Sequence, residues 1–228
     1  NDAYPTAIRL AATFAVQRLL VEHEALSVAF GRKAQEFAAV LKVGRTQLQD
    51  AVPMTVGQEF RGWSVTLAAD RERFREVLGL LREINLGATA IGTGITADPR
   101  YAEAVRLELS ALVGVELRTA PDLIEATSDT GDFMALSGIL KRAAIKLSKI
   151  CNDLRLLSSG PQAGLGELLL PPRQAGSSIM PGKVNPVIPE VVNQVAFSVI
   201  GADATITAAA EAGQLQLNAF EPVIAHSL

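Results

Sequence analysis

The chain has 228 residues, of which 49% are apolar and only 5% are aromatic, so its core must be aliphatic, a balance that favours long helices. A formal charge of −3 argues against a nucleic-acid partner, because there is no basic excess to neutralise phosphate groups. Cys151 is the single cysteine, which excludes an intrachain disulfide and favours a reducing cytoplasm.

The first elements in chain order are predicted to be helices. Pro5 suits a first helical position, with Asp2 as the cap before it. A segment from about Glu24 is expected to end at Gly44, since glycine commonly follows the last residue of a helix. Over 56–84, apolar side chains then recur at alternating steps of three and four, which predicts a long helix with one apolar face.

Residues 86–98 interrupt this pattern and are expected to be irregular. The run 87–94 has some likeness to a nucleotide-binding GxGxxG motif, but no strand is predicted before it, so we interpret it as a helix-to-helix turn. Asp98-Pro99 opens the next helix, which should end near Gly114.

The second half carries the same apolar spacing over 133–157 and over 188–213. Ser128 or Asp129 can cap the first of these helices, and Asn185-Pro186 opens the second. Between them, 160–185 is long for a structureless loop, which signals function or mobility. The most apolar window, 191–210, argues against a membrane span because it contains strongly polar residues. These are Asn193, Gln194 and Asp203.

The apolar stripes together predict an all-α fold, a long-helix bundle. They include Ala and Gly as well as bulky residues, and small residues allow helices to approach closely. With a mean hydropathy of +0.25, the chain has more apolar helix face than one copy can cover. We therefore expect self-association into a multi-chain bundle.

The most informative stretch is 176–186, which reads Gly-Ser-Ser-Ile-Met-Pro-Gly-Lys-Val-Asn-Pro. A turn of this composition directs backbone N–H groups and the ammonium of Lys183 at one small volume, which suits a carboxylate or a developing oxyanion. A Gly-Ser-Ser sequence by itself is usually only a loop, and the residues that follow it are what make this stretch informative.

This stretch closely resembles the signature of the fumarase/aspartase superfamily. Residues 1–6 and 44–51 resemble two further motifs of that superfamily, so the resemblance covers essentially the whole chain. The neighbouring sequences, 170–175 and 186–194, are more similar to the aspartate ammonia-lyase family than to fumarase.

The resemblance implies a central helical domain over 1–228, truncated at both ends relative to the family, and an enzyme that reversibly eliminates ammonia from L-aspartate to give fumarate. It also implies a homotetramer whose central helices form one bundle, with each active site built from three subunits. The expected location is the cytoplasm, with neither nucleic acid nor a membrane as partner.

The resemblance also implies roles for residues in the motifs. Ser177 matches the family's proton-abstracting serine, and Lys183 and Asn185 would bind a substrate carboxylate and stabilise the enediolate. A serine hydroxyl is a very weak acid, so its action as a base needs nearby positive potential. We expect the loop that carries it to be mobile without ligand and to close over the substrate.

Ser178, Thr46 and Asn1 match family positions that hydrogen-bond the substrate. Without the motifs, Thr46 would be interpreted as a solvated or capping residue and Asn1 as part of a helix cap, and for Asn1 both interpretations stay open. Gln47 is assigned to substrate binding and stands where fumarases have a histidine, which favours aspartase. Glu190 is interpreted as a first-turn acid that complements the helix dipole rather than as a catalytic group.

No cofactor or metal is expected, because no cluster of cysteine, histidine or carboxylate residues has a metal-binding spacing. His23 and His226 lie in no motif, so catalysis by histidine is not expected. Two alternatives stay open. The chain could belong to a fumarase or another fumarate-forming lyase, or it could be an inactive oligomerisation core, as in the superfamily's lens crystallins.

Overall fold

The computed structural model describes residues 1–228. The helices are α1 (Ala3–Glu36), α2 (Val56–Leu80), α3 (Tyr101–Val113), α4 (Glu125–Ser128), α5 (Gly131–Leu157), α6 (Val187–Glu211) and α7 (Glu221–Ser227). The strands are β1 (Leu41–Thr46), β2 (Gln49–Thr55), β3 (Glu83–Ile84) and β4 (Arg118–Thr119). Long helices dominate, which confirms the predicted fold class, and the strands form only two small two-stranded sheets.

The chain divides into two compact units. The first combines Asn1–Ile139 with Thr205–Leu228, and the second is Leu140–Ala204.

Helix α1 in the first unit has 34 residues and therefore spans about 50 Å. Asp2 caps it as predicted, because its Oδ1 accepts the N–H of Ala3 at 2.8 Å. Pro5 is the third helical residue rather than the first, where its lack of an N–H still costs no helical hydrogen bond. The predicted end at Gly44 is wrong. The helix ends at Glu36, and Gly44 lies in strand β1.

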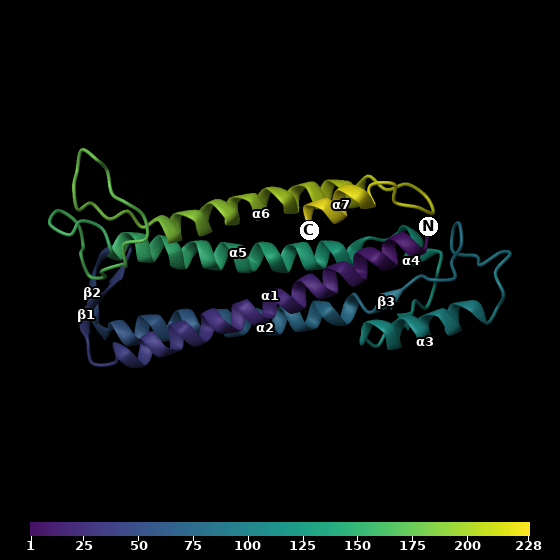
Figure 1. Cartoon of the computed structure of the whole chain (residues 1–228), viewed down its shortest axis with the longest axis horizontal. Helices are drawn as coiled ribbons and strands as arrows, with labels where there is room; N and C mark the ends of the chain where they lie inside the picture. The colour runs from purple at the N-terminus through teal and green to yellow at the C-terminus, as the bar shows by residue number, and fades with distance from the viewer. The chain divides into compact units, whose positions relative to one another are not determined.

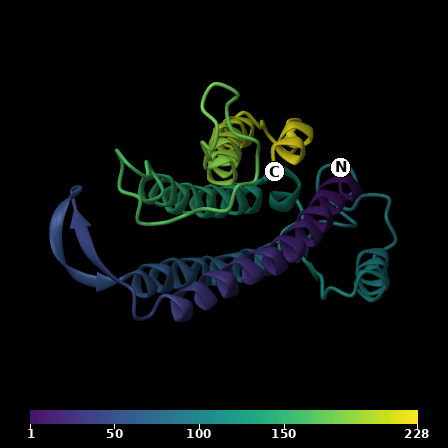
Figure 2. The ribbon, with the colours of Figure 1, turned by 60° about the vertical axis from the view of Figure 1, so that its left-hand side comes forward.

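Helix α2 returns alongside α1 after the β1–β2 hairpin, as both views of the ribbon show (Figures 1 and 2). A capping box starts it: Thr55 Oγ1 accepts the N–H of Gln58 at 3.1 Å, and the Gln58 side chain accepts the N–H of Thr55 at 2.9 Å. Aromatic rings fill the space between α1 and α2 near this end, with centroids 4.8–5.9 Å apart. They belong to Phe30, Phe37, Phe60 and Trp63.

The close contact between these helices depends on Gly57. A Cβ at this position would lie 2.4 Å from the carbonyl oxygen of Ala34 and 2.8 Å from the Cα of Ala38, and backbone atoms cannot rotate away. At Gly62, in the same helix, a Cβ would meet no heavy atom within 4 Å beyond the neighbouring backbone of the helix itself.

We expect Gly57→Ala to lower the free energy of unfolding by about 1–3 kcal/mol, because the added methyl forces the two helices apart. Gly62→Ala is the matched control and should be neutral or stabilise by up to about 1 kcal/mol, as alanine favours helix. Urea denaturation of both variants tests this. Equal free energies of unfolding for the two variants would show that α1 and α2 do not pack as closely as described.

At the other end of α2, a short parallel sheet pairs Glu83 with Arg118 and Ile84 with Thr119. Strand β3 thus precedes the glycine-rich run 87–94, which corrects the expectation that no strand does, although a strand of two residues does not make a nucleotide-binding fold. Helix α3 crosses between β3 and β4 and ends, as predicted, at Gly114 in a left-handed conformation.

In the second unit, Asn193 of α6 lies buried against α5. Its Nδ2 donates to Ser148 Oγ at 2.8 Å and to Asn152 Oδ1 at 3.1 Å, and its Oδ1 accepts from Arg155 at 3.2 Å. Asp203 of α6 also contacts α5, through an ion pair with Lys141. Polar residues of the apolar α6 therefore fix its alignment with α5.

Helix α6 is also long and apolar enough to cross a membrane by length and composition, and few of its residues are buried within this chain. The core helices of other proteins meet the same criteria of length and composition.

Cys151 of α5 is buried, and burial raises the pKa of its thiol.

Candidate functional site

The predicted serine and lysine lie in one tight loop, 176–183, of the second unit. The Ser177 carbonyl accepts the N–H of Met180 at 3.2 Å, and the Met180 carbonyl accepts the N–H of Lys183 at 3.2 Å. A Cβ at Gly176 would lie 2.3 Å from the Lys183 carbonyl oxygen, so only glycine lets the two ends of the loop meet. Gly182, with φ +82°, makes the second turn.

The Ser177 hydroxyl oxygen accepts the backbone N–H of Ile179 at 3.2 Å. An N–H donated to this oxygen stabilises negative charge on it, which is the condition under which a serine can remove a proton. Ser177 is partly buried, whereas Ser178, Lys183 and Asn185 are exposed. The loop therefore presents polar groups to a ligand from one short segment.

The segment before this loop is fixed to the end of α5. The Leu157 carbonyl accepts the N–H groups of Glu167 and Leu168 at 2.8 and 3.1 Å. A hollow of about 260 Å³ lies at the start of α6. The polar side chains that line it are the amide of Asn185 and the guanidinium of Arg173. Its other lining residues are apolar: Leu154, Leu170, Pro171, Pro186, Val187, Ile188 and Pro189.

Asn1 lies in the first unit, just before α1. Its Nδ2 donates to the Ala90 carbonyl at 2.7 Å, and its own carbonyl accepts from the Nδ2 of the buried Asn85 at 3.3 Å. Asp2 both caps α1 and accepts N–H groups from the glycine-rich loop. The cap and the binding interpretations of this segment are therefore compatible, since Asp2 caps the helix and Asn1 is exposed.

Thr46 and Gln47 lie at the tip of the β1–β2 hairpin. Thr46 pairs with Gln49 across the strands, and the two residues between them, Gln47 and Leu48, have φ angles of +53° and +63°. Positive φ at both positions defines a type I′ turn, which usually requires Asn or Gly. A residue other than glycine that is held at such a backbone angle destabilises the fold by on the order of 1–3 kcal/mol. Backbone strain of this kind clusters at functional sites.

The sequence did not predict this hairpin. Gly44 marks a bulge, where the register shifts between Val43 and Arg45, and the tip lacks the Asn-Gly pair by which such turns are recognised.

The structure brings some candidate residues together and separates others. Ser177, Ser178, Lys183 and Asn185 lie within nine residues of one another in the chain, on one loop and the start of α6. Asn1 and Thr46 lie beyond opposite ends of α1, about 50 Å apart along its axis. A small substrate cannot contact both of these residues in one copy of the chain.

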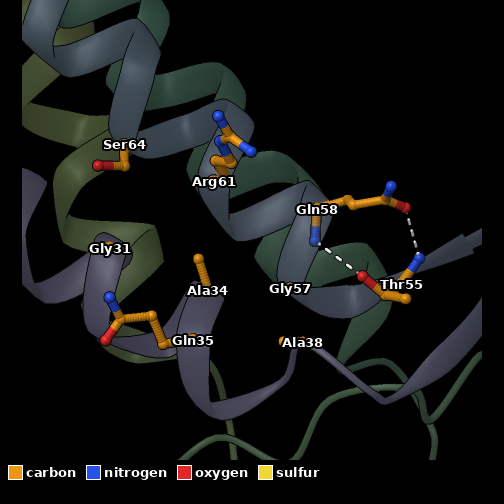
Figure 3. Close-up of a pocket in the computed structure, with 9 residues that line it drawn as sticks. All are labelled: Gly31, Ala34, Gln35, Ala38, Thr55, Gly57, Gln58, Arg61 and Ser64. Carbon is orange, nitrogen blue, oxygen red and sulfur yellow. Dashed lines mark hydrogen bonds between the residues drawn. The ribbon is translucent and has the colours of Figure 1, made fainter.

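A second hollow, of about 520 Å³, lies between α1 and the first turns of α2 (Figure 3). None of the predicted site residues lines it. Figure 3 shows that Thr55 and Gln58 are bonded to each other in the capping box. The remaining lining residues are Gly31, Ala34, Gln35, Ala38, Gly57, Arg61 and Ser64. Among the described residues, no group of three or more His, Cys, Asp or Glu side chains is placed to hold a metal ion.

Comparison with known proteins gives concordant matches. A family model described as lyase matches residues 1–201. Aspartate ammonia-lyase from Pseudomonas aeruginosa is 62% identical over 100% of this chain and 48% of its own length. Aspartate ammonia-lyase from Escherichia coli strain K12 is 57% identical, again over 100% of this chain and 48% of its own length.

Among solved structures, fumarate lyase:delta crystallin from Brucella melitensis bound to cobalt superposes with a TM-score of 0.97 at 59% identity, covering 100% of this chain and 49% of that chain. Class II fumarase from Schistosoma mansoni superposes with a TM-score of 0.96 at 35% identity, covering 100% and 51%. The chain thus spans about half the length of the curated relatives it matches.

Proposed function

The chain belongs to the lyase family whose model matches residues 1–201, and on that basis we propose that the protein eliminates ammonia from L-aspartate to give fumarate. The observation that carries this proposal is the identity of 57–62% to curated aspartate ammonia-lyases over the whole chain. The identity of 35% to a class II fumarase is lower. By the motif resemblance, Gln47 also stands where a histidine is expected in a fumarase.

The chemistry requires a base that removes a proton from Cβ of the substrate. The electron pair of that C–H bond moves into the adjacent carboxylate, giving an aci-carboxylate with two negative charges. It then returns to form the Cα–Cβ double bond as the C–N bond breaks and ammonia leaves. Stabilising the doubly charged intermediate is the main task of such a site, because that charge is absent from the ground state.

We assign the base to Ser177, whose oxygen accepts the Ile179 N–H. The ammonium of Lys183, six residues further along the same loop, would bind the substrate carboxylate and the charge that develops on it. Asn185 lies at the start of α6, where the positive end of the helix dipole adds to the same potential. Ser178, Thr46, Gln47 and Asn1 would hold the substrate in the orientation for anti-elimination.

We propose further that the protein is a homotetramer with active sites shared between copies. The length of α1 supports this, because it separates Asn1 from Thr46 by about 50 Å. Exposed apolar side chains supply surface for self-association: Phe197 of α6 is 64% exposed, and Leu48 at the hairpin tip is 69% exposed. We place this assembly in the cytoplasm, where the lone Cys151 would stay reduced.

The test compares L-aspartate with L-malate as substrates of the full-length protein that contains this chain. We expect fumarate and ammonia to appear in equal amounts from L-aspartate, and little fumarate from L-malate. Faster turnover of L-malate would assign the protein to fumarase instead. Turnover of neither substrate by a folded assembly would favour an inactive oligomerisation core.

A further inference from the structure

The Asp2 carboxylate links the start of α1 to the glycine-rich loop. Oδ1 accepts the N–H of Ala3 at 2.8 Å, as a helix cap does. Oδ2 accepts two N–H groups of the loop, from Gly87 at 3.0 Å and from Thr89 at 3.3 Å. The N–H of Ala88, which lies between them, is donated to the Asn85 carbonyl at 3.0 Å instead. Two backbone N–H groups aimed at one point form an anion-binding hollow, and here the anion is a carboxylate of the same chain.

The loop holds an unfavourable backbone conformation to make these bonds. Gly87 has φ +97°, and Thr89 has φ +60°, an angle that a β-branched residue rarely adopts. A Cβ at Gly87 would lie 2.6 Å from the Cβ of Ala102, so α3 packs directly on the loop. Such a conformation persists only where its surroundings determine it, and the Asp2 carboxylate is part of those surroundings.

The loop in turn fixes the amide of Asn1. The Ala90 carbonyl, one residue beyond the Thr89 N–H that binds Asp2, accepts from Asn1 Nδ2 at 2.7 Å. The adjacent residues Asn1 and Asp2 thus contact three residues of the loop, Gly87, Thr89 and Ala90. The bond to Ala90 sets which side of the Asn1 amide carries nitrogen, leaving its Oδ1 and its second N–H for a ligand.

Asn85 holds the opposite side of this arrangement. Its buried side chain donates to Thr127 Oγ1 at 3.1 Å as well as to the Asn1 carbonyl. The backbone of Asn1 is therefore fixed by Asn85, and its side chain by Ala90. Removing the Asp2 carboxylate would release Thr89 and Ala90, so the Asn1 side chain would lose its partner while its backbone stayed in place.

We propose that Asp2 is a positioning residue for the reaction: through Thr89 and Ala90, its carboxylate orients the Asn1 amide for the substrate. This rests on the proposed function, in which Asn1 contacts the substrate. The competing role for Asp2 is that of a helix cap alone, in which case its loss would affect stability but not the contribution of Asn1.

A double-mutant cycle in the full-length protein separates these roles. Asp2→Asn should lower kcat/KM for L-aspartate by about 10-fold or more, because the Asn1 amide is displaced and no longer matches the substrate. Added to Asn1→Ala, the same change should have little further effect, since the residue through which Asp2 acts is already gone. Asp2→Ser keeps a good helix cap and should lose the same activity as Asp2→Asn.

Asp98 offers a matched control. Its exposed carboxylate accepts the N–H of Arg100 and pairs with the guanidinium of Arg100, and Asp98→Asn should leave kcat/KM unchanged. Amide hydrogen exchange at Gly87 and Thr89 should be faster in Asp2→Asn and unchanged in Asp98→Asn. Additive losses in the double variant, or wild-type kcat/KM in Asp2→Asn, would overturn the role of Asp2. A wild-type protein that releases no fumarate from L-aspartate would contradict the proposed function itself.

Discussion

Ser177→Ala is expected to lower kcat by about 10² or more while leaving the helical assembly intact. Alanine cannot accept the Cβ proton, so the elimination loses its base. The loop itself should keep its shape, because the bonds from Met180 and Lys183 that close it are made by backbone groups. Steady-state kinetics with L-aspartate measures the loss, and circular dichroism checks that the helices are retained.

Ser158→Ala is the matched control for this change. The Ser158 hydroxyl donates only within its own segment, to the Arg155 carbonyl at 3.2 Å, and its removal should leave kcat unchanged. If Ser177→Ala kept a near-normal kcat, another group would have to be the base and the mechanism given above would be wrong.

Lys183→Ala is expected to lower kcat by about 10² and to raise KM as well. The two parameters should change together because the ammonium attracts the substrate carboxylate in the ground state and the added negative charge in the transition state. A base acts only in the chemical step, so Ser177→Ala should affect kcat more than KM. The pattern of kcat and KM therefore distinguishes the two roles.

Lys149→Ala removes an equivalent charge from a surface site in which Lys149 pairs with Asp153 one turn along α5. That exposed pair contributes little, and the variant should keep both kinetic parameters. An unchanged KM in Lys183→Ala would remove Lys183 from the substrate-binding site.

Much of the helical architecture could be predicted because its signals are local. The cap at Asp2, the glycine at 114 and the Asn185-Pro186 start of α6 each act within one or two turns of helix. The failure at Gly44 has a physical reason. A glycine in a bulge and a glycine after a helix look alike in sequence, and only pairing with β2 tells them apart.

In the candidate site, too, some features could be predicted from the local sequence and others could not. Ser177 and Lys183 belong to one contiguous turn, so their residue types and spacing were visible in the sequence. The bonds from Asp2 to Gly87 and Thr89 join positions 85 and 87 residues apart, and they depend on backbone N–H groups, which have no residue signature. Long-range backbone contacts of this kind appear only in the folded chain.

If one ammonia-lyase site is built from residues of different copies, as we propose, mixed assemblies of two inactive variants should recover activity. Asn1→Ala and Thr46→Ala should each be nearly inactive alone. When the two are co-expressed, about a quarter of the sites should take an intact Asn1 from one copy and an intact Thr46 from another, restoring a corresponding fraction of wild-type activity. Native mass spectrometry verifies that mixed assemblies form. If these assemblies are no more active than either parent, the site is not shared between copies in this way.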